Sequence, residues 1–231
     1  MNIMNDIVFY TCFFGSDYNW ANLIPNCPSK QFPCFYFTNN INTYSRLQGT
    51  GWITVFVDIP IKEDNTESSF DAKRLKACPH HYEMLNEHKY ICYFDSKHNV
   101  DVVKIEGLVE ILEKSDKLSI MIPKHPSNFH LIWEEYNLAI TVDKYKAEKD
   151  KYFKYIHKQL DNNFSDTVET HYTTQFILRK NNEVSQELNE LWYSHIQECG
   201  IMCQLSFFFI QQIFKENICS LNYQECYNYC F

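Results

Sequence analysis

Short apolar runs and amphipathic segments alternate along most of the chain. The apolar runs are rich in β-branched and aromatic residues, and they have the length of buried strands. We predict strands at residues 7–13, 34–37, 52–57, 90–94, 118–122 and 173–178. The run 90–94 is almost wholly apolar, which indicates a central position in a sheet.

Apolar residues between these runs recur at helical spacing, as Val102, Ile105, Val109 and Leu112 do. Strands that alternate with helices predict an α/β fold with a mostly parallel central sheet flanked by helices. The chain has no internal repeat and no evident linker, so we expect one domain over residues 1–231. Other helices are predicted at residues 71–77, within 132–160, around 188–196 and at 204–214, and a loose polar segment at 60–69.

Composition excludes several classes of protein. The chain has 231 residues, a formal net charge of -8 and only 5 glycines. It has no G-x-G-x-x-G and no G-x-x-x-x-G-K-[ST] motif, which excludes the Gly-rich phosphate loops. The negative charge argues against a nucleic-acid partner. The N-terminus lacks the features of a signal peptide and no apolar stretch would span a bilayer, so we expect a soluble, cytoplasmic protein without a transmembrane segment.

The ten cysteines are spread over the whole chain. This distribution favours reduced, mostly buried thiols over a disulfide framework. Cys219, Cys226 and Cys230 lie in a Cys-rich tail at residues 216–231. A structural zinc site and adventitious disulfides are the alternatives, although the chain contains no C-x-x-C pair.

Polar residues follow three of the predicted strands. Gly15 follows the first strand, Asn39 follows the second, and Asp95, Ser96 and Lys97 follow the fourth. In open α/β sheets, ligands bind beyond the carboxyl ends of the strands. Asp95 is therefore a candidate ligand for a divalent cation that bridges diphosphate oxygens. The alternative is that Asp95 only caps the following turn.

Cations gather at residues 73–81 of this otherwise acidic protein. Lys73, Arg74 and Lys76 are followed closely by His80 and His81. Such a cluster is suited to gripping a diphosphate, and the alternative is a solvated helix face. Because His80 and His81 are adjacent in sequence, we expect their imidazoles to face different ways and not to form a metal site by themselves.

A third candidate group follows the fifth predicted strand. His125 comes just after that strand, and Glu134 and Glu135 lie further along. Either glutamate is a candidate general base or a ligand for a hydroxyl group. The alternative is an ordinary acidic helix start, which the helix dipole favours. No G-x-S-x-G and no H-E-x-x-H motif is present.

Several segments, taken in order, resemble the glycosyltransferase-like domain family of the TOD/MUCI type. The resemblance covers roughly residues 7–215. The matching segments are Tyr10-Thr11-Cys12-Phe13-Phe14-Gly15, Cys34-Phe35-Tyr36-Phe37-Thr38-Asn39-Asn40, Gly51-Trp52, residues 73–80, Tyr93-Phe94-Asp95-Ser96-Lys97, His125-Pro126, Trp133-Glu134-Glu135, Leu178-Arg179, residues 188–192 and Gln204-Leu205-Ser206-Phe207.

The resemblance implies a GT-A-like, Rossmann-like fold and a hexosyltransferase type of activity. A sugar would pass from a nucleotide-diphosphate donor to a hydroxyl of a glycan, protein or lipid acceptor. The catalytic residues that the resemblance implies are Asp95, Glu134, Glu135 and Gln204. Asp95 would hold the metal or sugar hydroxyls, and the other three would face the sugar or the acceptor. The residues implied in substrate and nucleotide binding are Thr11, Gly15, Asn39, Lys73, Lys76, His80, Ser96, Lys97 and His125.

Two residues depart from the pattern that the resemblance implies. Lys97 takes the place of the second acid of a D-x-D motif, so the need for Mn²⁺ or Mg²⁺ is left open. Cys203 takes the place of an aspartate before Gln204. This second departure keeps open a catalytically inactive protein that binds nucleotide sugars or glycans. A hydrolase of lipids or glycans is a further alternative, which family analogy alone suggests.

Overall fold

The computed structural model describes residues 6–16, 24–62, 64–222 and 227–229. In this part of the chain the main sheet has seven strands in the order β3-β2-β1-β4-β7-β6-β8, and a small sheet pairs β5 with β9. Only β7 runs against its neighbours, so the sheet is mostly parallel, as predicted. The strands are β1 (Ile7–Phe13), β2 (Cys34–Thr38), β3 (Ile53–Phe56), β4 (Tyr90–Phe94), β5 (His98–Val100), β6 (Ile120–Pro123), β7 (Phe176–Lys180), β8 (Ile218–Leu221) and β9 (Tyr227–Tyr229).

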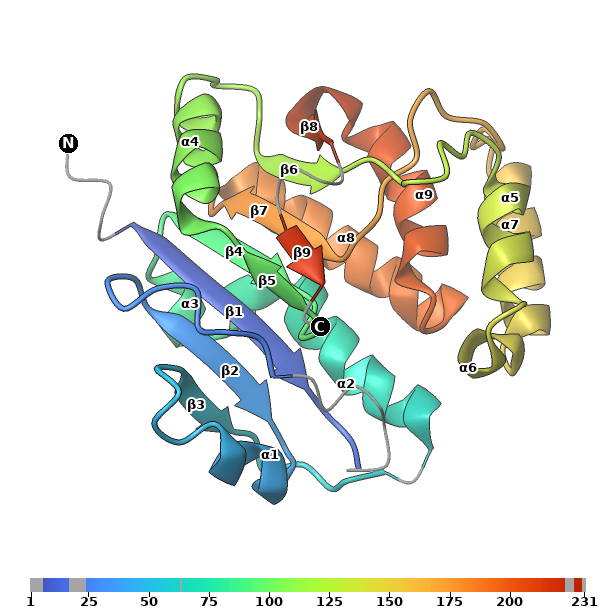
Figure 1. The fold of residues 1–231 in the computed structure, drawn as a ribbon. Coiled ribbons are helices and arrows are strands. Elements are labelled where there is room, and N and C mark those ends of the chain that lie inside the picture. Colours follow the sequence, from blue (N-terminus) through green and yellow to red (C-terminus); the bar gives the residue numbers. More distant parts are fainter. Residues whose placement is uncertain (1–5, 17–23, 63, 223–226, 230–231) are drawn as a thin grey trace.

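Helices cover both faces of the main sheet, which gives an α/β fold (Figure 1). One face packs its apolar side chains against α2, α8 and α9, and the other packs against α4. A third apolar cluster lies among α5, α7 and α9, to one side of the sheet (Figure 1). The helices are α1 (Ile41–Arg46), α2 (Asn65–Ala77), α3 (Glu83–Asn86), α4 (Val102–Glu113), α5 (Ile132–Ala139), α6 (Asp143–Lys146), α7 (Lys149–Asp161), α8 (Glu183–Cys199) and α9 (Cys203–Ile213), with short 3-10 turns η2 (Pro79–His81) and η3 (Lys215–Asn217).

The central position predicted for the strand at residues 90–94 is confirmed. β4 lies between β1 and β7, all of its side chains are buried, and it has three strands on either side. Alternate residues of the neighbouring β1 serve the two faces: Val8 and Tyr10 belong to one apolar cluster, and Ile7 and Phe9 to the other. A strand that is buried on both faces needs a continuous apolar run, which explains the sequence pattern.

Some predicted boundaries were wrong. The segment 60–69, predicted to be loose, contains the first turns of α2, because the Asp64 side chain accepts a hydrogen bond from the Thr66 N–H and caps the helix. The strand predicted at residues 173–178 begins later, at Phe176. The long charged segment 132–160 is divided into α5, α6 and α7. The strand β8 was not predicted from the sequence at all. Among the described residues, no helix is both long and apolar enough to cross a bilayer.

Candidate functional site

The carboxylate of Asp95 lies where the central strand β4 ends. Two hydrogen bonds fix its backbone: the Asp95 N–H donates to the carbonyl of Gln175, just before β7 (2.8 Å), and the Asp95 carbonyl accepts from the His98 N–H across a tight turn (2.9 Å). The Tyr93 hydroxyl donates to the carboxylate oxygen Oδ1 over 2.7 Å. Ser96 and Lys97 form the turn between β4 and β5. The carboxylate is therefore held in place at the edge where open α/β sheets bind ligands.

Lys76 reaches this carboxylate from the last turn of α2. Its ammonium lies 3.2 Å from Asp95 Oδ1 and 4.9 Å from the centre of the Tyr93 ring, yet only 4% of the side chain is exposed. A buried lysine keeps its charge only when a partner compensates the loss of water, and Asp95 is that partner. The sequence placed both residues at the site, and the structure brings them into contact.

The backbone of Lys76 is fixed from the sheet. Arg179 on β7 donates from Nη2 to the Lys76 carbonyl (2.9 Å), and the Tyr10 hydroxyl donates to the same oxygen over 3.2 Å. Arg179 is fully buried, and its Nε donates to the Asn189 side chain (3.0 Å). A cation at the last carbonyls of a helix also interacts favourably with the helix dipole. These contacts determine where the Lys76 side chain begins.

Further lysines surround Asp95. Burial alone would raise the pKa of Asp95, but the positive charges of Lys76, Lys97 and Lys73 hold that pKa well below its ordinary value. Lys144 on α6, which the sequence did not single out, faces the same carboxylate. Its side chain remains open to solvent, yet the surrounding protein and the charge of Lys73 lower the pKa of Lys144 to about 8. We call Lys73, Lys76, Lys97 and Lys144 the lysine cluster.

Cys203 lies beside this cluster at the start of α9. Its thiol is buried, and Sγ is 3.2 Å from the Thr174 hydroxyl. Burial would raise the pKa of Cys203, but the charge of Lys73, followed by that of Lys76, lowers it below its ordinary value. Burial would likewise lower the pKa of Lys73, and the Cys203 sulfur raises it. The position where the resemblance implies an aspartate is thus next to the lysine cluster.

The ends of β1 and β2 meet at the same edge of the sheet as Asp95. The Gly15 N–H donates to the Asn39 side chain (3.0 Å), and the Asn40 amide donates to the Gly15 carbonyl (3.0 Å). Gly15 has a φ of 128°, a region that favours glycine. These contacts shape the backbone of the loop. Thr11 lies deeper in β1, fully buried, and its hydroxyl has no hydrogen-bond partner in the described part of the chain.

A second polar cluster is built around Glu135, which is fully buried on α5. Its Oε2 is 3.0 Å from His171 Nε2 and 3.4 Å from His125 Nε2, and its Oε1 accepts from the Gln204 amide over 3.1 Å. We call Glu135, His125, His171 and Gln204 the Glu135 cluster. His171, at the end of a long loop, was missed because nothing in its sequence context distinguishes it.

Charges from both clusters act on Tyr145 of α6. Burial raises the pKa of its hydroxyl, and the charges of Lys73, Asp95 and Glu135 all act on that hydroxyl, as the Cys203 sulfur does. Charges act at this strength only over short distances. Residues of the lysine cluster and Glu135 therefore both lie within electrostatic reach of Tyr145.

The remaining candidates are engaged elsewhere. The Glu134 carboxylate accepts hydrogen bonds from the backbone N–H groups of His130 and Leu131, both at 2.8 Å, and thereby caps the start of α5. His80 and His81 both point their Nε2 atoms at one oxygen of Glu190 on α8, with His80 at 2.9 Å. The expectation that these adjacent imidazoles face different ways was wrong, because the η2 turn brings them together.

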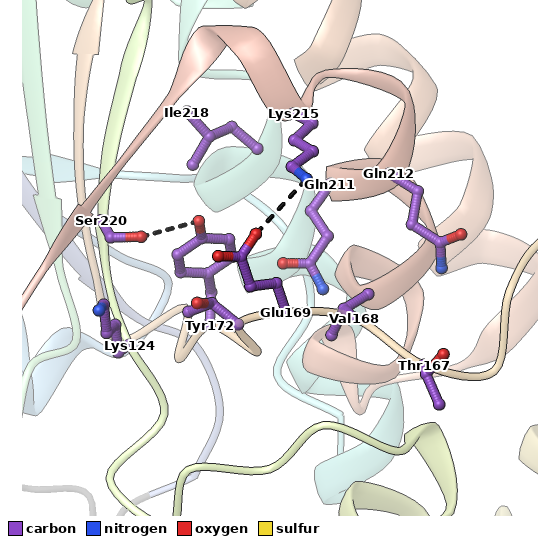
Figure 2. A pocket seen from close by; sticks show the side chains of 11 residues that line it. Lys124, Thr167, Val168, Glu169, Tyr172, Gln211, Gln212, Lys215, Ile218 and Ser220 are labelled. Atoms are coloured by element: carbon purple, nitrogen blue, oxygen red, sulfur yellow. Dashed lines mark hydrogen bonds and ion pairs between the residues drawn. The ribbon is translucent and has the colours of Figure 1, made fainter.

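A cavity of about 470 Å³ opens at another part of the molecule. It lies between the loop 167–172, the end of α9 and β8 (Figure 2). Both polar atoms of the Gln211 amide are buried there without a hydrogen-bond partner among the described residues. Lys215 pairs with Glu169 over 3.5 Å, and the Tyr172 hydroxyl with Ser220 over 2.9 Å. The lining suits a polar ligand, and the sequence had placed no candidate residue in it.

The residues around Asp95 do not fit a divalent cation. Such an ion is usually held by one or two carboxylates that are free to coordinate it, together with phosphate oxygens. Here one carboxylate is surrounded by ammonium groups, and its Oδ1 is already occupied by Tyr93 and Lys76. The ammonium groups therefore place positive charge beside Asp95 without a metal.

The cysteines described by the structure are all free thiols, and most are buried. This agrees with the predicted reduced state for that part of the chain. Cys226 and Cys230, which belong to the predicted Cys-rich tail, lie outside the described residues.

Comparisons with known proteins identify the fold. No protein-family model matches the chain, and no curated protein sequence matches it. Solved structures do. The apo form of mouse xyloside xylosyltransferase 1 matches with a TM-score of 0.53 at 10% identity, over 94% of this chain and 84% of that one. Core-mannan synthase A from Aspergillus fumigatus, in a Mn/GDP form, matches with a TM-score of 0.51 at 11% identity, over 97% of this chain and 74% of that one.

The fold is that of the GT-A glycosyltransferases. At this level of identity the similarity concerns the fold alone. The finer resemblance to the TOD/MUCI type stays a prediction.

Proposed function

We propose that this chain is a glycosyltransferase that uses a nucleotide-diphosphate sugar and holds the diphosphate with its lysine cluster. The observation that carries the proposal is the buried Lys76–Asp95 pair at the end of the central strand, surrounded by further ammonium groups. Ammonium groups bind phosphate oxygens and stabilise the negative charge that develops on a departing diphosphate. The GT-A fold supports the same function by analogy.

In the proposed reaction, a hydroxyl oxygen of the acceptor bonds to the anomeric carbon of the sugar. The bond from that carbon to the diphosphate breaks, and its electron pair remains on the diphosphate. Lys73, Lys76 and Lys144 stabilise that charge in place of a divalent cation. The proton of the hydroxyl group leaves to a base, for which Glu135 is our candidate because it is held by His171 and acts on Tyr145 together with Lys73 and Asp95. Gly15 and Asn39 shape the loop proposed to meet the nucleoside.

A second candidate function is binding without turnover. It is favoured by Cys203, since a thiol beside Lys73 replaces the carboxylate that the family resemblance implies at this position. The acceptor in the leading proposal is a hydroxyl of a glycan, protein or lipid. We also propose that the protein is cytoplasmic, as the sequence led us to expect.

Calorimetric titration of the purified protein with UDP and GDP, with and without Mn²⁺, tests the proposed site. We expect one nucleoside diphosphate to bind without added metal. Lys73→Met and Lys76→Met should each weaken binding roughly tenfold or more, the effect of losing one charged hydrogen bond. Lys104→Met, on the exposed surface of α4, is the matched control. If no nucleoside diphosphate binds, or if both cluster variants bind like the wild type, the site assignment is wrong.

Turnover separates the two candidate functions. The nucleotide sugars of whichever base binds are incubated with the protein and an acceptor mixture, and released nucleoside diphosphate is measured. Release that depends on the lysine cluster supports the transferase. Binding without any release, for every donor of that base, supports the inactive binding protein.

A further inference from the structure

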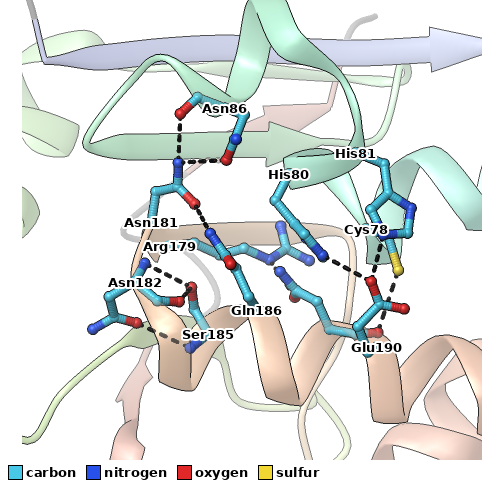
Figure 3. Close-up of polar contacts among 11 residues, drawn as sticks. Cys78, His80, His81, Asn86, Arg179, Asn181, Asn182, Ser185, Gln186 and Glu190 are labelled. Carbon is cyan, nitrogen blue, oxygen red and sulfur yellow. Dashed lines mark hydrogen bonds and ion pairs between the residues drawn. The ribbon is translucent and has the colours of Figure 1, made fainter.

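A group of potential metal ligands lies apart from the lysine cluster, between η2 and α8. Cys78, His81 and Glu190 each place a ligand atom within 4.8 Å of the other two. Figure 3 shows the Cys78 sulfur and the His81 imidazole beside the Glu190 carboxylate, and His80 Nε2 also lies 2.9 Å from Glu190 Oε1. None of these side chains touches Asp95 or Glu135 in the contacts described above. The proposed transfer reaction assigns no step to this group.

We propose that Cys78, His81 and Glu190, joined by His80, bind a divalent transition metal of the zinc type. One sulfur, two imidazole nitrogens and one carboxylate oxygen form a four-ligand set that suits Zn²⁺. Mg²⁺ and Ca²⁺ prefer sets made of oxygen alone, so the soft sulfur selects against them.

The ligand atoms are close together, but the spacings between them differ from those of a bound zinc ion. Zinc bonds of about 2.0–2.3 Å imply distances of roughly 3.3–3.8 Å between the ligand atoms of a tetrahedron. His80 Nε2 lies 2.9 Å from Glu190 Oε1, His81 Nε2 contacts the same oxygen, and the sulfur is within 4.8 Å of the His81 and Glu190 ligand atoms. Zinc binding would therefore lengthen the His–Glu contacts and bring the sulfur to the same tetrahedral spacing.

The sequence and fold explain how the group assembles. Pro79 starts the η2 turn directly after α2, so Cys78, His80 and His81 follow one another closely in space. Glu190 comes from α8, which packs against α2. The Cys78 sulfur lies 3.5 Å from the Asn189 carbonyl, and Asn189 also holds Arg179. His80 Nδ1 is buried without a hydrogen-bond partner in the described part of the chain.

Metal binding would replace ion pairs by coordination bonds. The Cys78 thiol must lose its proton to become a metal ligand. A bound metal displaces this proton, which is released to solvent, and the thiolate becomes a ligand. Glu190 is half exposed, at 51% of its side chain, and His81 at 36%, so a metal can enter from solvent. The bound ion would clamp η2 to α8.

Cobalt substitution tests the site directly. The full chain is treated with a chelator, desalted and titrated with Co²⁺ under reducing conditions. We expect one tight equivalent with a thiolate-to-cobalt charge-transfer band and the intense visible bands of a tetrahedral site. Zn²⁺ should then remove both signals by displacing the cobalt.

Single substitutions assign the ligands. Cys78→Ser should abolish the charge-transfer band, and Glu190→Gln should weaken cobalt binding while leaving the fold intact, because Glu190 is on the surface. Cys219→Ser, at a half-buried thiol outside the group, is the matched control and should keep the full band. Circular dichroism confirms that each variant is folded. The proposal is overturned if the wild type takes up no cobalt, or if the signal survives Cys78→Ser and Glu190→Gln.

Discussion

The contact between Lys76 and Asp95 can be tested without any ligand. Lys76→Met, Asp95→Asn and the double variant form a thermodynamic cycle that isolates the interaction between the two side chains. The ammonium and the carboxylate oxygen are 3.2 Å apart, and only 4% and 26% of the two side chains are exposed. At an effective dielectric constant of about 20, charges at that distance attract by about 5 kcal/mol.

Two effects reduce this value. Burial of both charges opposes the attraction, and Asp95 keeps the hydrogen bond from Tyr93 and the charges of Lys97 and Lys73 after Lys76 is removed. We therefore expect a coupling energy of about 2 kcal/mol, which is the range for a hydrogen bond between charged groups. Asp95→Asn alone should cost about 3 kcal/mol, because it leaves a buried ammonium without its carboxylate.

Urea unfolding at pH 7, followed by circular dichroism, measures these free energies. The double variant should be about 2 kcal/mol more stable than the sum of the single losses predicts. Lys104→Met, on the exposed face of α4, should leave stability unchanged. Additive losses, to within about 0.5 kcal/mol, would refute the reasoning.

The same pair predicts a pH dependence. The pKa of Asp95 is lower in the folded state than its unfolded value of about 3.9. Its contribution to stability is therefore complete above about pH 5 and is lost as the pH falls towards the folded pKa. In Lys76→Met the folded pKa rises, so the stability difference from the wild type should narrow between about pH 5 and pH 2. A difference that stays constant over this range would contradict the assigned pairing.

The remaining predictions concern two glycines and the candidate base. Gly200 has a φ of 119°, and an added Cβ would lie 2.6 Å from Glu148 Oε2, so Gly200→Ala should cost about 2 kcal/mol in urea unfolding. Gly107→Ala, where an added Cβ meets nothing within 4 Å on the exposed face of α4, should be neutral or stabilising by up to about 1 kcal/mol. Glu135→Gln should lower donor turnover by roughly 100-fold, whereas Glu134→Gln should leave it unchanged; equal losses in both variants would remove Glu135 from the proposed role of base.

Much of the sheet could be predicted because strands buried on both faces leave continuous apolar runs. The run that forms β4 is such a case, and it places Asp95 at the centre of the edge. The direction of β7 could not be predicted, because an antiparallel strand has the same composition as a parallel one. The true end of β7 was also hidden, since Arg179 is buried through hydrogen bonds and not through hydrophobicity.

The sequence predicted the residues of the candidate site only where they lie close to one another in the chain or directly after a predicted strand. The lysines of α2 and the residue after β4 were found from local patterns and from the rule on strand ends. Lys144 and His171 come from segments far away in the sequence, and their positions depend on how α5, α6 and the loop 167–172 pack. The convergence of His80 and His81 depends on the backbone dihedral angles of the η2 turn, and the fact that the two residues are adjacent in sequence does not determine those angles.

The hydrogen bond from Arg179 to the Lys76 carbonyl has a consequence for synthesis on the ribosome. The two residues are 103 positions apart, and β7 is the strand that covers the free side of β4. Until residues 176–180 have left the exit tunnel, the nascent chain holds β3, β2, β1 and β4 with an unpaired apolar edge. Such an edge invites association with other chains. The strand that fixes the backbone of Lys76 therefore also covers the edge of β4 that the nascent chain leaves exposed.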